Sequence, residues 1–394
     1  MQSDKQFQQN RLINSLSIGM FVSGAGSLLL GPLMPYLREH FGFGYEITGT
    51  LLSMQSLGNF IATILAGFLP LLLGRRKSIM FTSIWLCIAY FLIVSGVGGI
   101  AVLLISCLMM GFARGGTSTF SNTMISTLPD NSSARGYNRI HGTYAFGAFI
   151  SPLLLLLMAK INASMGWRMV AVVMGCLSFA QFLVFSKMTL PSEVMMSKKK
   201  KVDTSFFKNR YFQTGAVMIF CYISAEYAIS GWLVTYFQDS GILTASQAQL
   251  MNSLFWLFIC IGRLVGSKIV GRVSRDRLLI IDGIGFVICF VIMFLSRSFI
   301  SITLSLVGVS LFMATIYPTL FSFGCSAMAG NDFGCSLFNF IGSVGGIITP
   351  FAVGIVAKNI GIEAGMAFVV GVVLLLLCTI LTGIALTKNH KKVA

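Results

Sequence analysis

Long runs of apolar residues, separated by short polar and basic segments, recur along the whole chain. A helix needs roughly 20 mostly apolar residues to cross the hydrocarbon core of a bilayer. Strict alternation of apolar and polar positions, as in an outer-membrane β-barrel, is not visible. Because a helix satisfies its own backbone hydrogen bonds in lipid, we expect an all-α membrane protein. Twelve runs predict spanning helices, near residues 12–36, 47–73, 79–97, 99–126, 140–159, 167–187, 212–237, 248–271, 278–296, 299–324, 335–357 and 364–387.

The composition agrees with lipid as the main solvent. Hydrophobic residues make up 56% of the chain and charged residues 10%, whereas globular domains are about 25% charged. A soluble protein of this length has too much surface to hide so many apolar side chains. The nine cysteines lie within or at the edges of the apolar runs and lack metal-ligand spacing. We therefore expect neither a disulfide framework nor a metal site, and no cofactor.

The basic residues are unevenly distributed between the loops. With a cytoplasmic N-terminus, nineteen Lys and Arg residues fall on cytoplasmic loops and tails and five on the opposite side. This is the positive-inside bias, and it predicts a multi-pass protein of the cell membrane with both termini in the cytoplasm. The net charge of +16 then needs no nucleic-acid partner. The first apolar run is too long for a cleaved signal peptide, so we expect it to be the first span.

The chain divides into two halves that resemble each other. The longest hydrophilic interruption, residues 191–210, separates a predicted six-helix bundle at 1–190 from a second at 211–394. The fifth predicted helix contains Gly147-x-x-x-x-Pro152, and the eleventh contains Gly345-x-x-x-x-Pro350. Such symmetry predicts two pseudo-symmetric repeats related by an axis along the membrane normal, with the substrate at their interface.

The second predicted helix is followed by the run Gly74-Arg75-Arg76-Lys77, and the loop between the two halves is basic. With the twelve predicted helices and the similarity of the two halves, this arrangement resembles the major facilitator superfamily. The family's loop usually reads G-x-L-A-D-R-x-G-R-R. Here Leu71 stands at the position of that motif's acidic residue. In the corresponding loop of the second half, after the eighth predicted helix, Gly271 stands at the same position. The departure affects the expected charge relay between the halves on the cytoplasmic side, but not the expected fold.

Five short stretches stand out: Gly111–Asn122, Asn138-Arg-Ile-His141 with Gly147 and Pro152, Glu226 with Gly231-Trp232-Leu-Val-Thr-Tyr236, Gly262-Arg263-Leu264 and Tyr317-Pro318-Thr319. They resemble the fucose–galactose–glucose–proton symporter branch of that superfamily. This resemblance implies uptake of a monosaccharide coupled to a cation, usually H⁺. The fifth helix has Ser151-Pro152 followed by leucines instead of the G-x-x-x-G-P-x-x-G-G pattern of drug antiporters, which favours symport or uniport.

Three ionisable residues are candidates for proton coupling, because charges inside a span are costly and therefore usually functional. Glu226 lies near the middle of the seventh predicted helix, where a carboxyl group is tolerated if it is protonated or paired. Arg114 lies in the fourth helix and needs a partner, which we expect to be Glu226, an anionic substrate or helix-end carbonyls. His141 opens the fifth helix and suits a pH-sensitive step, although a hydrogen-bonding role at the helix end is the alternative.

Polar and aromatic residues within the spans are candidates for binding a sugar, because small-molecule sites combine apolar walls with a few placed polar groups. Three pairs are four residues apart and therefore share a helix face. The alternative for each residue is a hydrogen bond between helices. The candidates are Gln55, Asn59, Asn122, Trp232, Tyr236, Asn252, Trp256 and Asn339.

No nucleotide-binding G-x-x-x-x-G-K-[ST] loop and no catalytic cluster is present, so we expect a transporter that is not an enzyme and draws on a proton or sodium gradient. The leading hypothesis is a monomeric, proton-coupled monosaccharide symporter that works by alternating access. The alternatives are an exporter of drugs or amphipathic metabolites, and an organic-anion carrier in which Arg114 holds the anion.

Overall fold

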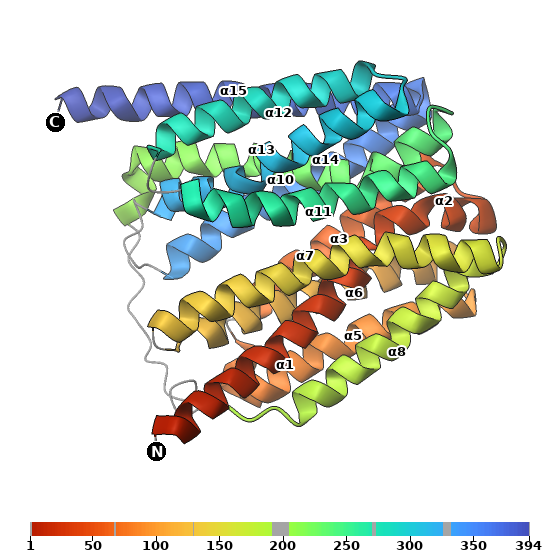
Figure 1. Ribbon diagram of the computed structural model, residues 1–394, viewed down its shortest axis with the longest axis horizontal. Coiled ribbons are helices and arrows are strands. Elements are labelled where there is room, and N and C mark those ends of the chain that lie inside the picture. Colours follow the sequence, from red (N-terminus) through yellow and green to blue (C-terminus); the bar gives the residue numbers. More distant parts are fainter. Residues whose placement is uncertain are drawn as a thin grey trace. The chain divides into compact units, whose positions relative to one another are not determined.

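The computed structural model describes residues 2–66, 68–128, 130–190, 205–269, 273–325 and 332–393, and these residues are almost entirely helical (Figure 1). The first half contains α1 (Gln2–Leu28), α2 (Leu30–Phe41), α3 (Tyr45–Leu65), α4 (Leu69–Leu73), α5 (Arg75–Ser95), α6 (Gly99–Ser126), α7 (Asp130–Ile161) and α8 (Gly166–Ser186). After a short 3₁₀ helix (Ser205–Lys208), the second half contains α10 (Arg210–Asp239), α11 (Ala245–Ile269), α12 (Arg275–Leu295), α13 (Phe299–Cys325), α14 (Asp332–Ile360) and α15 (Ile362–Val393).

The all-α membrane fold predicted from the apolar runs is confirmed. Within the described part of the chain, eleven helical stretches are long and apolar enough to cross a membrane. The second predicted span, 47–73, forms the more polar α3 and the short α4, and it is absent from those eleven. Much of the predicted linker, residues 191–204, lies outside the described residues.

The first predicted span is divided into α1 and α2. Pro32 has no N–H to donate to the carbonyl of Leu28, which is the last residue of α1. The helix resumes at Leu30, and the N–H of Leu33 donates to the carbonyl of Leu29 at 3.0 Å. It ends at Gly42, whose φ of 67° lies in the left-handed region that favours glycine.

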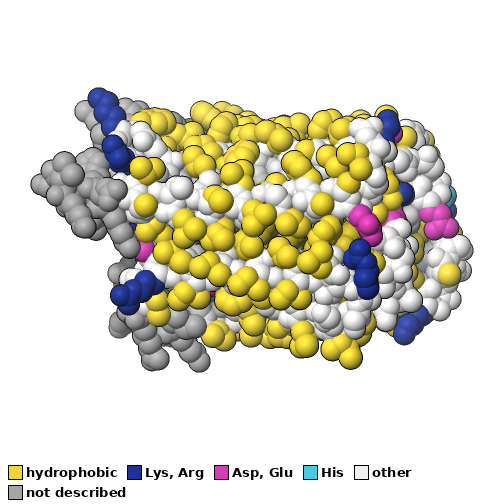
Figure 2. All heavy atoms as spheres, turned by 90° about the horizontal axis from the view of Figure 1, so that it is seen from above, with side chains coloured by type: hydrophobic (Ala, Val, Ile, Leu, Met, Phe, Trp, Pro, Cys, Tyr) yellow, Lys and Arg dark blue, Asp and Glu magenta, His cyan; other side chains and the backbone are white. Residues whose placement is uncertain are grey.

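Many large apolar side chains are exposed on the outer faces of the helices. Figure 2 shows hydrophobic side chains covering the middle of the visible face, with charged side chains near its ends. Ile300, Leu304 and Leu295 are each at least 68% exposed. A soluble monomer rarely exposes contiguous apolar surface on this scale, so these faces are suited to contact with lipid.

The structure separates into two compact units: Met1–Phe43 with Met54–Lys200, here called the N-terminal unit, and Gly44–Ser53 with Lys201–Ala394, the C-terminal unit. The beginning of α3 therefore packs with the second half of the chain. There the hydroxyl of Ser53 donates to the carbonyl of Ile347 at 2.6 Å, and Glu46 forms an ion pair with Lys358 at 3.3 Å.

The two units repeat the same helix packing. In the N-terminal unit α1 packs against α7, α5 against α6 and α5 against α8, and in the C-terminal unit the equivalent pairs are α10 with α14, α12 with α13 and α12 with α15. A Cβ atom on Gly147 of α7 would lie 2.2 Å from the carbonyl oxygen of Phe21 in α1. A Cβ atom on Gly345 of α14 would lie 2.6 Å from that of Phe220 in α10. The two Gly-x-x-x-x-Pro motifs thus mark the same close helix contact in each unit.

Candidate functional site

Glu226 lies in the middle of α10 and is only 8% exposed. Tyr222 lies one helical turn earlier on the same face and is fully buried. The Tyr222 hydroxyl donates to the carbonyl oxygen of Met313 on α13 at 3.2 Å. Glu226 was predicted from its place inside the span, whereas Tyr222 was not, although its four-residue spacing from Glu226 was an available signal.

Asn339 of α14 belongs to the same polar region of the C-terminal unit. Its side-chain oxygen accepts a hydrogen bond from the Tyr317 hydroxyl of α13 at 2.9 Å. The Tyr317 ring lies 5.9 Å from the Tyr222 ring. Polar side chains from α10, α13 and α14 therefore converge around Tyr222, which lies one helical turn from Glu226.

A second group of polar residues forms a stripe on α11. Gln249, Asn252, Ser253 and Trp256 follow the spacing of one helix face, and all are buried. Both side-chain polar atoms of Asn252, the hydroxyl of Ser253 and the indole nitrogen of Trp256 have no hydrogen-bond partner within the part of the chain that the structure describes. A buried polar group without a partner typically costs about 1–3 kcal/mol. Such a stripe therefore has spare capacity to bind a polar molecule.

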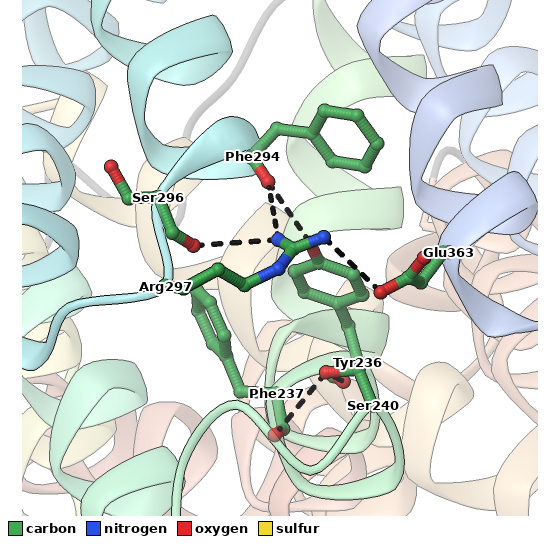
Figure 3. Close-up of polar contacts among 7 residues, drawn as sticks. All are labelled: Tyr236, Phe237, Ser240, Phe294, Ser296, Arg297 and Glu363. Carbon is green, nitrogen blue, oxygen red and sulfur yellow. Dashed lines mark hydrogen bonds and ion pairs between the residues drawn. The ribbon is translucent and has the colours of Figure 1, made fainter.

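The aromatic pair on α10 is arranged differently. The indole nitrogen of Trp232 donates to the carbonyl oxygen of Pro350 on α14 at 3.2 Å, and the hydroxyl of Tyr236 donates to that of Phe294 on α12 at 3.3 Å. Figure 3 shows that the Phe294 carbonyl also accepts a hydrogen bond from Arg297, at 3.1 Å. The polar atoms of both aromatic residues are thus engaged in contacts between helices.

In the N-terminal unit, most of the predicted polar candidates have partners within the unit. Gln55 donates to the carbonyl of Ser27 at 2.7 Å, while Asn59 is half-buried on the same face of α3. The side-chain oxygen of Asn122 lies 3.1 Å from a ring nitrogen of His141, and Tyr137 donates to the Asn122 carbonyl at 3.1 Å. This contact joins α7 to α6. The expectation that His141 opens its helix is wrong, because α7 begins at Asp130 and His141 lies about three turns inside it.

Arg114 lies in α6, where its guanidinium carbon is 5.9 Å from the ring centroid of Tyr144 on α7. A cation near an aromatic face is attracted by the ring quadrupole. The pairing of Arg114 with Glu226 stays a prediction.

One buried acid lies outside these groups. Asp282 on α12 is 5% exposed, and its carboxylate accepts a hydrogen bond from the Thr315 hydroxyl of α13 at 2.6 Å. This contact joins two neighbouring helices of the C-terminal unit.

Residues 16–350 match the family model of the Major Facilitator Superfamily, and the chain belongs to that family. It is a multi-pass membrane transporter and not an enzyme. This identification agrees with the resemblance found in the sequence and with the paired helix packing of the two units.

Similar proteins include a "Glucose/galactose transporter" of Brucella abortus, which is 23% identical over 378 residues and aligns with 92% of this chain and 90% of its own. Among solved structures, a D-xylose-proton symporter matches with a TM-score of 0.78 at 13% identity, covering 95% of this chain and 96% of its own. The E. coli fucose:proton symporter FucP matches with a TM-score of 0.65 at 18% identity, covering 94% of this chain and 98% of its own. These two structures share the fold of this protein.

Proposed function

We propose that the protein imports a neutral monosaccharide together with protons, by alternating access. The name of the Brucella relative supports the substrate class. The names of two proteins with the same fold, a D-xylose-proton and a fucose:proton symporter, support the coupling. The distribution of basic residues supports a location in the cell membrane with both termini in the cytoplasm.

The observation that carries the proposal is the spare hydrogen-bonding capacity of the α11 stripe. A sugar hydroxyl both donates and accepts hydrogen bonds, and the amide of Asn252 offers one donor group and one acceptor that can engage two neighbouring hydroxyls. The Ser253 hydroxyl and the Trp256 indole N–H add further polar contacts, while the indole face provides apolar area for the C–H groups of a sugar ring.

Glu226 is the proposed proton site. A carboxyl group that is mostly buried in a span is stable when it is protonated or paired. It can therefore carry a proton inward when the protein reorients, and release it where the site opens to the cytoplasm. Arg114 and His141 remain further candidates for the coupling.

Substrate-dependent proton movement in proteoliposomes tests the proposal. We expect addition of glucose, galactose, fucose or xylose to make the external medium more alkaline in sodium-free buffer. Alkalinisation only with organic anions, and its loss in Arg114→Gln, would establish the anion carrier instead. Proton movement only with amphipathic drugs would establish the exporter.

The Glu226→Gln variant tests the proton site. Because glutamine resembles the protonated carboxyl group, we expect this variant to bind sugar and exchange it down its gradient, but to lose accumulation driven by a pH difference. If Glu226 instead forms a static ion pair with Arg114, the single variant strands a charge and loses about 3–5 kcal/mol of stability. The double variant with Arg114→Gln would then restore expression. A stable single variant with full proton-driven uptake would contradict both roles.

A further inference from the structure

Asp282 on α12 is a buried acid that the proposed transport mechanism does not use. It is 5% exposed, and its carboxyl group lies 2.6 Å from the Thr315 hydroxyl of α13. It follows Arg275, the first residue of α12, by seven positions, which places it about 10 Å along the helix from that end. A carboxylate buried within a span is unfavourable unless it is paired or protonated.

The helices packed against α12 bring few charged groups to this acid. α13 contains no Asp, Glu, Lys, Arg or His, and its Tyr317 bonds to α14. The acids and bases of α15 lie near its two ends, at Glu363 and from Lys388 onward, and Cys378 between them is exposed. The nearest partner that these helices provide is therefore the neutral hydroxyl of Thr315.

The charged residues of α12 itself lie at its beginning. Arg275 pairs with Asp276 at 3.9 Å and donates to the carbonyl oxygen of Ser322 on α13 at 3.2 Å. In the part of the chain that the structure describes, no ion pair includes Asp282. The other bases on α12 and on α11, which also contacts Thr315, are Arg277, Arg263 and Lys268.

The equivalent place in the N-terminal unit holds no acid. When the first residues of α5 and α12, Arg75 and Arg275, are aligned, every buried position of α12 falls on a buried position of α5. Thr82 then corresponds to Asp282, and a Cβ atom on Gly116 of α6 would collide with Thr82. The Thr82 hydroxyl bonds within its own helix, at 3.2 and 3.3 Å. A neutral residue therefore suffices for this helix contact, and packing alone does not account for the acid in α12.

Thr315 is oriented so that it can bond to Asp282 in either protonation state. Its methyl group lies against Gly266 of α11, where a Cβ atom would collide with it, and its hydroxyl reaches Asp282. The hydroxyl also lies 3.4 Å from the carbonyl oxygen of Phe312 in its own helix. It donates to Asp282 when that group is ionised. When Asp282 is protonated, the new O–H donates to the Thr315 oxygen, and the Thr315 proton turns to Phe312.

We propose that Asp282 is a second proton-binding site of the C-terminal unit, separate from Glu226, and that Thr315 bonds to both its protonated and its charged form. The site lies near the end of α12 that the distribution of basic residues predicts to be cytoplasmic, so we expect its proton to exchange with that side. This inference goes beyond the proposed function, because proton binding at Asp282 does not depend on which substrate is carried.

Infrared difference spectroscopy of the purified protein tests the site, because the carbonyl stretch of a protonated carboxyl group lies apart from the carboxylate and amide bands. Spectra are recorded as the pH is raised from a value at which exposed carboxyl groups are already ionised. We expect the Glu226→Gln protein to retain a protonated-carboxyl band that disappears as the pH rises further. The double variant Glu226→Gln/Asp282→Asn should lack this band, which separates Asp282 from Glu226.

Removal of the Thr315 hydroxyl should shift the titration of this band. Thr315→Val keeps the shape of the side chain but cannot donate to the charged form, so the band should persist to about one pH unit higher. Thr319→Val is the matched control, because the Thr319 hydroxyl bonds to the carbonyl oxygen of Thr315 in its own helix, at 2.6 Å. Its band should disappear at the same pH as in the parent. An equal shift in both variants would overturn the role of Thr315.

If Asp282→Asn does not fold, the pair Asp282→Thr/Thr315→Gly transfers the arrangement of Thr82 and Gly116 into the C-terminal unit, and it should also lack the band. A band of unchanged size in the folded variants would overturn the proposal. A Glu226→Gln protein without any such band would overturn it as well, because Asp282 would then be ionised throughout. Neither result bears on the proposed function, which is tested separately by sugar-dependent proton movement in proteoliposomes.

Discussion

Trp232 with Tyr236 on α10 and Asn252 with Trp256 on α11 are two pairs that share a four-residue spacing and deep burial. Their polar atoms are nevertheless used differently. The α10 pair donates to the carbonyl oxygens of Pro350 and Phe294. For the α11 pair, the amide atoms and the indole nitrogen have no hydrogen-bond partner among the described residues.

This difference separates polar residues that join helices from polar residues that are suited to a ligand. Inside a membrane protein, a polar side chain that reaches a carbonyl on another helix contributes about 0.6 kcal/mol on average to helix association. A buried amide without a partner lowers stability until a ligand supplies the missing hydrogen bonds. Burial and residue type alone do not distinguish the two pairs, whereas unused hydrogen-bonding capacity does.

The largest expected effect is on substrate binding through α11. Asn252→Leu keeps the approximate volume of the side chain but removes both unmatched polar atoms. We expect affinity for the transported sugar to fall about fivefold to 150-fold, because about 1–3 kcal/mol of hydrogen bonding is lost. The thermal unfolding temperature without sugar should stay the same or rise, because an unpaired buried group is removed. Unchanged affinity, measured by isothermal titration or by protection against unfolding, would place the sugar elsewhere.

The α10 pair should give the opposite pattern. Trp232→Phe removes the N–H that binds the Pro350 carbonyl and leaves a small cavity, so we expect stability to fall by about 1–3 kcal/mol. Sugar affinity of the folded variant should match the wild type. Thermal unfolding in detergent measures the first effect and sugar titration the second. A large loss of affinity with normal stability would show that Trp232 contacts the sugar, and the contrast between the pairs would be wrong.

The smallest expected effect is at the end of α10, in the polar group of Figure 3. Arg297 forms an ion pair with Glu363 at 3.2 Å, and the two side chains are 55% and 57% exposed. Exposed ion pairs of this kind contribute roughly 0–1 kcal/mol. Glu363→Gln should therefore change stability by less than about 1 kcal/mol and leave the contact between Tyr236 and Phe294 in place. A loss as large as that of Trp232→Phe would show that the stability of the α10 pair depends on this ion pair.

The sequence by itself determined the helical membrane fold and the approximate limits of its helices. Crossing lipid demands a long apolar run in one continuous stretch of chain, so the signal is local and readable: the run predicted at 99–126 is α6, Gly99–Ser126. The break between α1 and α2 was not predicted, although Pro32 provided the local signal. The position of Glu226 inside a span was also evident from its neighbours in the chain.

Only the tertiary structure decided which polar side chains already have partners. The Pro350 carbonyl that engages Trp232 is 118 positions away in sequence, and the Met313 carbonyl that engages Tyr222 is 91 positions away. Spacing along one helix places residues on a common face, but the acceptors come from other helices, whose rotation and contacts depend on packing. For this reason Trp232 and Trp256 were equivalent candidates in the sequence. Only helix packing distinguished Trp232, whose indole N–H joins two helices, from Trp256, whose indole N–H has no hydrogen-bond partner among the described residues.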